Sequence, residues 1–377
     1  MGMMKLGSLL MFGLSGMAFG IWAQAPVRVP EGVKAHRDLV YVKDGHERHK
    51  LDLYLPETKS DELLPLIIWV HGGGWQNGSK EGCPPLRGGY VEKGYAVASI
   101  NYRLSGHAVF PAQIEDCKAA VRWLRAHADE YGLDAKRFGV WGSSAGGHLV
   151  ALMGTSGDVK AFDVGAHLDQ SSRVQAVCDY FGPTDFEVFV KTPGYERVAN
   201  VESPEAKLLG GAVLENKDKA ARANPINYVS KDDPPFLMVH GDADKTVPLN
   251  QSELLFESLK NSGVSAQLHT IRGGGHGRPG FGSEEIAKLV VDFFDERLKK
   301  GATKVVALTT ESVAEEGEAP PMNRGEGRRI PWEMVLRRDD KDGDGTVKKG
   351  EFSGPAGLFQ RLDANGDGVL TREEVER

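Results

Sequence analysis

Short runs of hydrophobic residues recur along the first 300 residues and alternate with segments in which apolar side chains have helical spacing. The runs without polar alternation are 64–70, 95–100, 138–141, 174–180, 236–240 and 267–271. Strands of this kind are covered on both faces, as in a parallel sheet. The segments 112–131 and 284–299 have helical spacing, and the second is followed by Gly301, a typical helix stop. This alternation of strand and helix predicts an α/β fold over about 35–300.

Three segments depart from the alternation. Residues 38–43 and 48–55 alternate apolar and polar positions around Asp44-Gly45, which predicts an opening hairpin. Residues 182–234 are rich in Pro, Gly and charge and lie between two predicted strands, so we expect an inserted cap there. Residues 301–328 lose periodicity and gain Glu, Gly, Pro and Thr, a composition typical of a linker.

The first 25 residues have the pattern of a signal peptide. Lys5 precedes an apolar, glycine-containing run, and Ala23-Gln24-Ala25 fits the small-x-small cleavage pattern. Cleavage after Ala23 and cleavage after Ala25 both stay open, because Pro26 follows directly. An uncleaved anchor is less favoured, since the run is barely long enough to span a bilayer. We therefore expect an exported protein, periplasmic or extracellular, with no membrane span after cleavage.

Composition narrows the class of protein. The chain is 40% hydrophobic and 26% charged, which is typical of a globular protein. Its net charge of -7 argues against a nucleic-acid partner, because phosphate contacts need clustered Lys and Arg. Three cysteines allow at most one disulfide, and the sequence does not pair them. We expect Cys117 and Cys178 to be buried and Cys83, which precedes two prolines, to be the most exposed.

One turn carries the pattern of a nucleophile. Gly142-x-Ser144-x-Gly146 follows the apolar run 138–141 and precedes a helix-like stretch, 147–153. A sharp strand-to-helix turn in this context projects a serine hydroxyl above the sheet. An ordinary surface turn is the alternative, because the pattern also occurs by chance. We predict that Ser144 is the nucleophile of an acyl-transfer site.

A glycine-rich loop provides candidate donors for an oxyanion. His71-Gly72-Gly73-Gly74 follows the run 64–70, and residues without side chains let backbone N–H groups approach a developing alkoxide. We assign the donors to Gly73, Gly74 and Ala145 and expect His71 to be structural. A phosphate cradle is the competing interpretation, but the sequence patterns of phosphate-binding loops are missing.

The base and the acid follow from chain order, which is Ser, then acid, then His in this kind of site. His269 lies inside a predicted strand, whereas His276 lies in a glycine-rich loop after the last strand, so His276 is the predicted base. Asp242 and Asp244 both follow the run 236–240, and the residues alone leave the choice between them open.

Together these motifs resemble those of bacterial feruloyl-esterase-type (BD-FAE-like) α/β hydrolases, relatives of the hormone-sensitive-lipase and acetyl-esterase group. The motifs are His71-Gly-Gly-Gly-Trp75, Tyr102-Arg103-Leu-Ser-Gly106, Phe110-Pro-Ala-Gln-Ile-Glu-Asp-Cys117, Gly142-Ser-Ser-Ala-Gly-Gly-His148 and His240-Gly-Asp-Ala-Asp244. The resemblance covers about 35–300 and implies an α/β-hydrolase fold with a doubly wound, mostly parallel sheet. It also implies hydrolysis of carboxylic esters, such as acetyl or feruloyl groups on polysaccharides, without an organic cofactor. Its triad would be Ser144, Asp244 and His276, which favours Asp244 over Asp242.

Two stretches near the C-terminus, 340–351 and 363–374, match the calcium-loop pattern D-x-[DN]-x-[DN]-G-x5-E. Side-chain oxygens at positions 1, 3, 5 and 12 and the backbone carbonyl at position 7 bind calcium in such loops. The expected ligands are Asp340, Asp342, Asp344, Thr346 and Glu351 in the first loop and Asp363, Asn365, Asp367, Val369 and Glu374 in the second. Val347 and Leu370 should pair the loops through a short β ladder. We therefore predict a small all-α EF-hand pair over 329–377 that binds calcium outside the catalytic site.

This predicted pair differs from regulatory EF-hands. Lys348 at position 9 of the first loop offers no ligand oxygen. A module of about 50 residues has a small core, so calcium should supply much of its folding free energy. We expect a structural or attachment role, with a cell-surface or protein partner, and no role as a switch.

The leading hypothesis is an exported serine carboxylesterase whose partners are a small ester or acylated glycan and calcium. A serine exopeptidase of similar fold is one alternative. A calcium-dependent binding or cell-surface protein with a vestigial hydrolase domain is another. His148 and Asp185 have plainer interpretations, as a packing residue and a turn residue.

Overall fold

The computed structural model describes residues 28–58, 62–299, 340, 342, 344–352, 362–363 and 365–375. The predicted signal peptide over 1–25 and linker over 301–328 lie outside the described residues. The chain divides into two compact units, Met1–Val305 and Val306–Arg377. Each unit has a hydrophobic core of its own.

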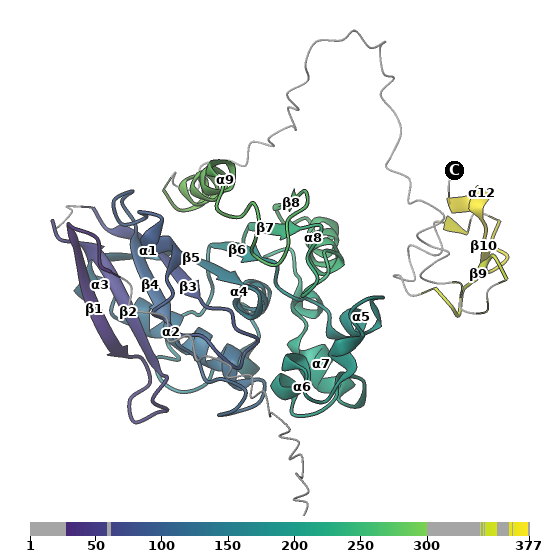
Figure 1. Cartoon of the computed structure of the whole chain (residues 1–377), viewed down its shortest axis with the longest axis horizontal. Coiled ribbons are helices and arrows are strands. Elements are labelled where there is room, and N and C mark those ends of the chain that lie inside the picture. Colours follow the sequence, from purple (N-terminus) through teal and green to yellow (C-terminus); the bar gives the residue numbers. More distant parts are fainter. Residues whose placement is uncertain are drawn as a thin grey trace, which may run out of the picture. The chain divides into compact units, whose positions relative to one another are not determined.

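The larger unit is built on an eight-stranded sheet in the order β1-β2-β4-β3-β5-β6-β7-β8 (Figure 1). The strands are β1 (Val33–Val40), β2 (Lys50–Pro56), β3 (Leu64–Val70), β4 (Ala96–Ile100), β5 (Leu133–Ser143), β6 (Ala176–Tyr180), β7 (Phe236–Gly241) and β8 (Ala266–Ile271). β1 and β2 form the predicted hairpin and pair antiparallel, as do β2 and β4. The remaining neighbours pair parallel. The predicted α/β fold with a mostly parallel sheet is confirmed.

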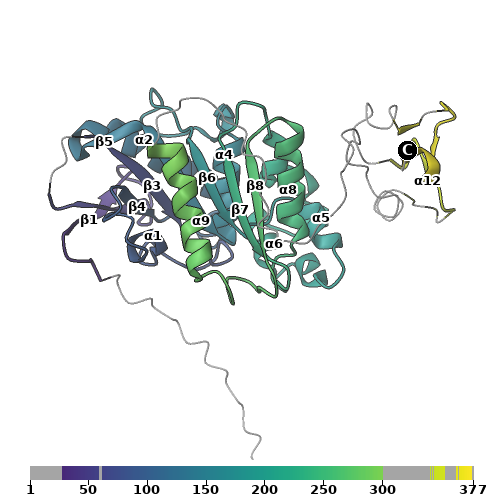
Figure 2. The ribbon, with the colours of Figure 1, turned by 90° about the horizontal axis from the view of Figure 1, so that it is seen from above.

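Helices cover both faces of this sheet. They are α1 (Pro84–Arg87), α2 (Ala112–Ala126), α3 (Ala128–Tyr131), α4 (Ala145–Thr155), α8 (Asn250–Asn261) and α9 (Glu284–Phe294). Residues of α2, α4 and α8 pack in one core, and residues of α1 and α9 pack in the other. Figure 2 shows α9 lying across its face of the sheet.

Burial on both faces explains the unbroken hydrophobic runs. Within β3, Leu66 and Ile68 belong to the core under α2 and α4, whereas Ile67 and Trp69 belong to the core under α9. Successive side chains of a strand point to opposite faces, so a strand covered twice must be apolar at every position.

Several boundaries differ from the expected ones. β5 begins at Leu133, five residues before the apolar run, and Leu133 pairs there with Leu64 of β3. Asp134 and Arg137 form an ion pair in this polar start. The helix expected over 112–131 is divided at His127, which lies between α2 and α3. The helix expected over 284–299 is α-helical only to Phe294 and ends in a π-helical turn, Asp295–Lys299.

The expectation that Cys83 is the most exposed cysteine is wrong. All three cysteines are free and buried. Cys83 immediately precedes α1, which folds this loop onto the sheet, so its side chain lies in the same core as Leu86 and Val97. Burial raises the pKa of the Cys83 thiol to about 12, which keeps it protonated and unreactive.

The predicted insertion, 182–234, lies between β6 and β7 and contains short helices. They are α5 (Phe186–Lys191), η2 (Glu196–Ala199), α6 (Pro204–Leu209), η3 (Val213–Glu215), α7 (Lys217–Ala223) and η4 (Pro225–Tyr228). Asp185 accepts hydrogen bonds from the backbone N–H groups of Glu187 and Val188, so it caps α5. Ser203 caps α6 in the same way through Ala206.

The smaller unit contains β9 (Val347–Lys348), β10 (Val369–Leu370) and α12 (Arg372–Val375). β9 and β10 pair antiparallel, and Val347 lies opposite Leu370. Among the described residues of this unit, these two and Val375 form a buried hydrophobic cluster, with Phe352 and Leu362 packed against them.

None of the helices in the described part of the chain combines the length and the hydrophobicity that a bilayer span requires.

Candidate active site

Ser144 occupies the sharp turn between β5 and α4. Its backbone has φ 55° and ψ -122°, a region that costs a non-glycine residue roughly 1–3 kcal/mol. Two glycines make the turn possible. A Cβ atom on Gly146 would lie 2.1 Å from the Val70 carbonyl oxygen, and one on Gly142 would lie 2.3 Å from the Gly146 oxygen. The Gly-x-Ser-x-Gly pattern is therefore required by close backbone packing that exposes the Ser144 side chain.

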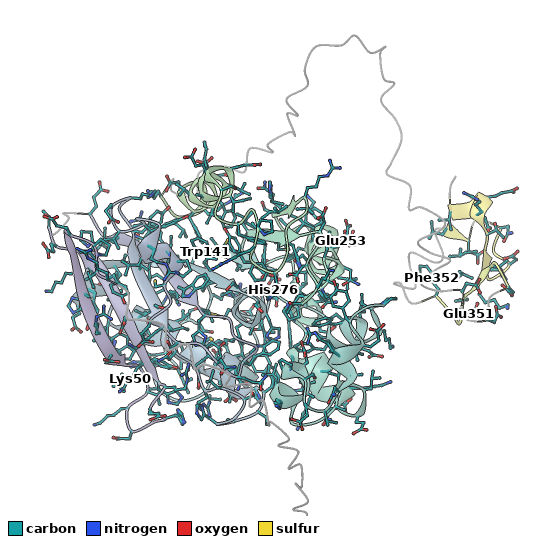
Figure 3. All side chains as sticks on the ribbon, in the orientation of Figure 1. Lys50, Trp141, Glu253, His276, Glu351 and Phe352 are labelled. Atoms are coloured by element: carbon teal, nitrogen blue, oxygen red, sulfur yellow. The ribbon has the colours of Figure 1, made fainter. Side chains whose placement is uncertain are left out.

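His276 and Asp244 form a hydrogen-bonded chain with this serine. His276 Nε2 lies 2.9 Å from Ser144 Oγ, and His276 Nδ1 lies 2.7 Å from Asp244 Oδ2. His276, labelled in Figure 3, comes from the loop after β8, and Asp244 from the loop after β7. A proton on Nδ1 donates to the carboxylate and leaves Nε2 free to accept from the hydroxyl.

The environment of Asp244 favours its ionised form. Burial opposes ionisation, but hydrogen bonds from His240, His276 and the Thr246 backbone outweigh it and hold the pKa of Asp244 well below its usual range. His240 Nε2 is 3.5 Å from Asp244 Oδ2 and only 3.0 Å from the Val247 oxygen, so we regard His240 as a weaker partner than His276.

The two rejected candidates have other contacts. Asp242 Oδ1 accepts a hydrogen bond from the Gly273 backbone N–H at 2.6 Å, so Asp242 braces the loop that carries His276. His269 lies within β8 and has Glu285 Oε1 3.9 Å away. The structure brings Ser144, Asp244 and His276 together. Asp242 and His269 lie outside this hydrogen-bonded triad.

The three predicted oxyanion donors lie beside Ser144. Gly73, Gly74 and Ala145 line the same cavity as Ser144. Their backbone N–H groups donate to no acceptor among the described residues. Gly73 has φ 112°, and an added Cβ there would lie 2.4 Å from the Asn77 oxygen, so only glycine fits this bend.

His71 holds this loop in the way expected of a structural residue. Its Nδ1 lies 2.7 Å from the Gly72 oxygen, and its Nε2 lies 3.1 Å from Arg48 Nη2. Burial lowers the pKa of His71 to about 3, so the ring is neutral, donating through Nδ1 and accepting through Nε2. Arg48 also donates to the oxygens of Gly78 and Tyr102. This arginine was not predicted from the sequence, because no local pattern marks it.

Trp75 and His148 link the glycine loop to the insertion. Trp75 Nε1 donates to His148 Nδ1 at 3.3 Å, and His148 Nε2 lies 2.7 Å from the Ala223 oxygen. Burial lowers the pKa of His148 to about 4, so the ring stays neutral and both nitrogens are satisfied. The expected packing role of His148 fits these contacts.

Asp179 is a buried carboxyl behind the nucleophile turn that the sequence did not indicate. Its Oδ1 accepts from the Gly182 backbone N–H at 2.9 Å, while its Oδ2 has no hydrogen-bond partner among the described residues. Burial raises the pKa of Asp179 to about 6, although the Gly182 hydrogen bond and the charge of His240 oppose the shift.

The cavity above Ser144 has a volume of about 460 Å³. Its wall combines the glycine loop and the nucleophile with residues of the insertion and of the loop after β7. Apart from Ser144 and His276, its polar residues are Gln76, Asn77, Ser143, Arg197, Glu205 and Thr246, and its apolar side chains include Trp75, Phe181, Pro183, Pro204 and Val247. A small ester therefore has room beside the hydroxyl of Ser144.

The two predicted calcium loops present oxygen atoms on tight turns. Gly345 and Gly368 have φ 83° and 82°, as the sixth position requires. Carboxylate oxygens of Asp340, Asp342 and Asp344 lie within 4.8 Å of one another.

Two further contacts bear on whether these loops fit a cation. Asp363 Oδ1 is buried without a hydrogen-bond partner among the described residues, which suits an oxygen that ligates a metal. In the first loop, Lys348 Nζ lies 2.5 Å from Asp342 Oδ2 and 2.6 Å from Asp344 Oδ2. Both loops thus fit a hard cation, but in the first one an ammonium group competes for the carboxylates.

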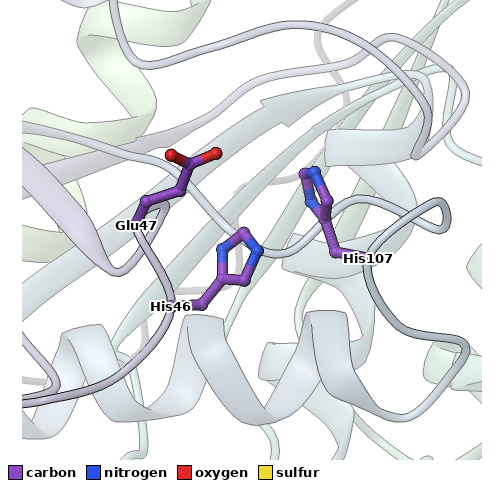
Figure 4. A group of neighbouring side chains, drawn as sticks. All are labelled: His46, Glu47 and His107. Carbon is purple, nitrogen blue, oxygen red and sulfur yellow. The ribbon is translucent and has the colours of Figure 1, made fainter.

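His46, Glu47 and His107 form another group of potential metal ligands, with ligand atoms within 4.8 Å of one another (Figure 4). The Nδ1 atoms of His46 and His107 accept the backbone N–H groups of Arg48 and Leu104, at 3.1 and 3.2 Å. The Nδ1 lone pair of each ring is therefore already occupied by a backbone N–H group and is not free for a metal. The cluster suits two packed loops better than a metal.

Comparison with known proteins identifies the family to which this chain belongs. Residues 51–259, more than half of the chain, match the family BD-FAE. The chain belongs to the BD-FAE family. The esterase LipQ of Mycobacterium tuberculosis is 32% identical over 232 residues, which is 60% of this chain and 53% of LipQ. The chain thus spans about half the length of this curated relative.

Solved structures resemble the BD-FAE domain as well. A truncated carbohydrate esterase from gut microbiota is 35% identical, with a TM-score of 0.64 over 71% of this chain and 97% of its own. An acetyl ester-xyloside bifunctional hydrolase from Caldicellulosiruptor lactoaceticus is 29% identical, with a TM-score of 0.54 over 66% and 87%. The BD-FAE domain of this chain is therefore that of a carboxylic ester hydrolase, and its fold is the α/β-hydrolase fold.

Proposed function

We propose that this protein is an exported serine carboxylesterase that hydrolyses acyl esters, such as acetyl or feruloyl groups, on polysaccharides. The observation that carries the proposal is the unbroken hydrogen-bonded chain from Ser144 through His276 to Asp244 beside a cavity. The similarity to a carbohydrate esterase and to an acetyl ester-xyloside hydrolase supports the substrate class.

The first half-reaction follows from the geometry. Ser144 Oγ attacks the ester carbonyl carbon while His276 Nε2, 2.9 Å away, takes its proton. The negative charge that develops on the carbonyl oxygen is stabilised by the N–H groups of Gly73, Gly74 and Ala145. His276 then gives its proton to the leaving alcohol oxygen, and an acyl group remains on Ser144.

The second half-reaction repeats these steps with water. His276 Nε2 removes a proton from water, the resulting hydroxide attacks the acyl carbonyl, and Ser144 leaves as its alcohol when His276 returns the proton. Throughout, Asp244 accepts from His276 Nδ1 and stabilises the imidazolium form. The low pKa of Asp244 keeps it ionised for this role.

Hydrolysis of 4-nitrophenyl acetate by the purified protein and its Ser144→Ala variant tests this proposal. We expect the variant to lose activity by a factor of at least about 10³, because the nucleophile is removed. Ser258→Ala on α8, which does not line the cavity, is the matched control and should retain the wild-type rate. Equal rates in the wild type and Ser144→Ala would overturn the proposal.

We further propose that 329–377 is an EF-hand pair stabilised by calcium, with a structural or attachment role outside the catalytic site. Asp340, Asp342, Asp344, Thr346 and Glu351 would hold one ion, and the matching residues of the second loop the other. Calcium adds folding free energy to this small unit when bound. Thermal unfolding of the full chain with calcium and with chelator tests this: the transition of this unit should move upward with calcium, while the esterase rate stays the same.

A further inference from the structure

The wall of the cavity above Ser144 contains one pair of opposite charges. Among the described lining residues, Arg197 and Glu205 carry the formal charges beside His276. Both belong to the insertion between β6 and β7, and neither takes part in the hydrogen-bonded chain of Ser144. Their chemistry bears on which ester the cavity accepts.

Arg197 is exposed to the cavity and held from three sides. Its Nη2 donates to the Thr246 oxygen at 2.5 Å, and its guanidinium carbon lies 5.8 Å from the centre of the Phe189 ring. Its Nη1 lies 3.7 Å from Glu205 Oε2. The side chain is nevertheless 42% exposed, so N–H groups remain for a ligand. An arginine oriented before the ligand arrives loses less entropy on binding it.

Glu205 is the buried acidic neighbour of Arg197. Its side chain is only 4% exposed, and Oε2 is buried with no hydrogen-bond partner among the described residues. Burial raises the pKa of Glu205, and its own backbone N–H and the charge of Arg197 partly offset the shift. A buried carboxyl in this position is costly unless it serves a neighbouring cation. Its neighbour here is the cavity-facing Arg197.

The remaining polar groups of the wall are neutral. Gln76, Asn77 and Thr246 offer amide and hydroxyl groups that donate and accept hydrogen bonds. Because Glu205 offsets the charge of Arg197, the cavity has no strong preference for an anion. The same wall contains the apolar residues Phe181, Pro183, Pro204 and Val247. A neutral sugar, which presents both hydroxyl groups and C–H faces, matches this mixture better than a carboxylate does.

We propose that Arg197 is a specificity-determining residue that donates hydrogen bonds to hydroxyl oxygens of a neutral carbohydrate ester, and that Glu205 is its positioning residue. This inference rests on the proposed esterase function. It adds the part of the substrate that the cavity recognises: the sugar carrying the acyl group.

Two substrates separate recognition of the sugar from hydrolysis of the ester bond. One is a mono-O-acetylated methyl xyloside with free hydroxyl groups, and the other is 4-nitrophenyl acetate, which has none. Arg197→Met keeps an unbranched aliphatic side chain at this position and removes the guanidinium group with its N–H donors. We expect its kcat/KM on the xyloside to fall roughly tenfold to a hundredfold, mainly through KM, the range for losing a hydrogen bond to a charged group. On 4-nitrophenyl acetate we expect less than about a threefold change.

Lys207→Met is the matched control. Lys207 lies on α6, is 42% exposed like Arg197, and pairs with Glu202 at 3.1 Å away from the cavity lining. This variant should retain the wild-type kcat/KM on both substrates. Glu205→Gln should reproduce the selective loss of Arg197→Met more weakly, because the guanidinium loses its buried partner.

The outcomes distinguish this inference from the proposed function. Equal losses on both substrates in Arg197→Met would overturn the inference and make Arg197 a support for the Asp244 loop through Thr246. Unchanged kinetics on both would also overturn it, as would a wild type that rejects the neutral xyloside or prefers an acetyl ester bearing a carboxylate. If Ser144→Ala is as active as the wild type, the proposed function fails; if it is inactive, the inference stands or falls on Arg197 alone.

Discussion

Asp179 makes the stability of this domain depend on pH in a direction opposite to that of most carboxyl groups. The residue is the last but one of β6, where it pairs with Gly142 of the nucleophile turn, and its side chain is fully buried. Burial raises its pKa from 3.8 to about 6, against the opposing Gly182 hydrogen bond and His240 charge. The folded protein therefore holds this proton more tightly than the unfolded chain does.

The size and direction of the effect follow from this shift. A difference of about two pKa units corresponds to roughly 3 kcal/mol. Because the folded pKa is the higher one, this stabilisation is complete below about pH 4 and disappears as the pH rises through about 6. Asp179→Asn removes the titration and keeps an oxygen for the Gly182 N–H. Relative to the wild type, its free energy of unfolding should therefore rise by about 3 kcal/mol between pH 4 and pH 8.

Urea unfolding of both proteins, followed by tryptophan fluorescence across this pH range, measures the difference. Any loss of unfolding free energy caused by the asparagine itself is the same at pH 4 and pH 8. It therefore cancels when the two pH values are compared. Asp218→Asn on the surface of α7 is the control and should show no such trend. A wild-type-minus-variant difference that stays constant from pH 4 to pH 8 would refute the argument.

Three further changes have defined outcomes. Asp244→Asn should lower kcat on 4-nitrophenyl acetate by about three to four orders of magnitude with KM nearly unchanged, because the imidazolium loses its carboxylate; steady-state kinetics within tenfold of the wild type would contradict this. Trp75→Phe removes the hydrogen bond to buried His148 and should lower the free energy of unfolding by about 1–2 kcal/mol in urea titrations, whereas an unchanged midpoint would show that the bond is unimportant. Lys348→Gln removes the ammonium group from between Asp342 and Asp344, so calorimetric titration should show severalfold tighter calcium binding; equal or weaker binding would argue against competition by this lysine.

Local patterns were sufficient for the strands and for the nucleophile turn. The apolar run 64–70 coincides with β3, because a strand covered on both faces is marked at every position. The glycines around Ser144 are equally visible, since backbone packing at 2.1–2.3 Å from an added Cβ excludes any other residue. Such features depend on a few neighbouring residues, which a sequence displays directly.

Features that depend on contacts between distant segments were not predictable in this way. Arg48 reaches His71 across 23 residues, and Arg197 reaches Thr246 across 49. Asp179 lies in the run 174–180, whose apolar neighbours already indicate a strand covered on both faces, but its position behind the nucleophile turn depends on the packing of the whole sheet. The error on Cys83 has the same origin, because two prolines suggested a loop and in fact begin a helix that covers the cysteine.

The choice between Asp242 and Asp244 combines a feature that local sequence patterns reveal with one that depends on distant contacts. Both follow β7 and have the same chemistry, so the residues alone did not separate them. The turn after the strand directs one carboxylate toward His276 at 2.7 Å and the other toward the Gly273 backbone. The family resemblance favoured Asp244, but the physical distinction lies in the three-dimensional course of the loop.

The proposed reaction requires that Ser144 itself becomes acylated. A 4-nitrophenyl phosphonate ester, which phosphonylates an activated serine and is not turned over, tests it most directly. We expect release of one equivalent of 4-nitrophenol and a single phosphonyl adduct in the intact-protein mass. Peptide mass spectrometry should locate that adduct on Ser144, and the Ser144→Ala variant should carry none. An adduct on the neighbouring Ser143, or none on the wild type, would contradict it.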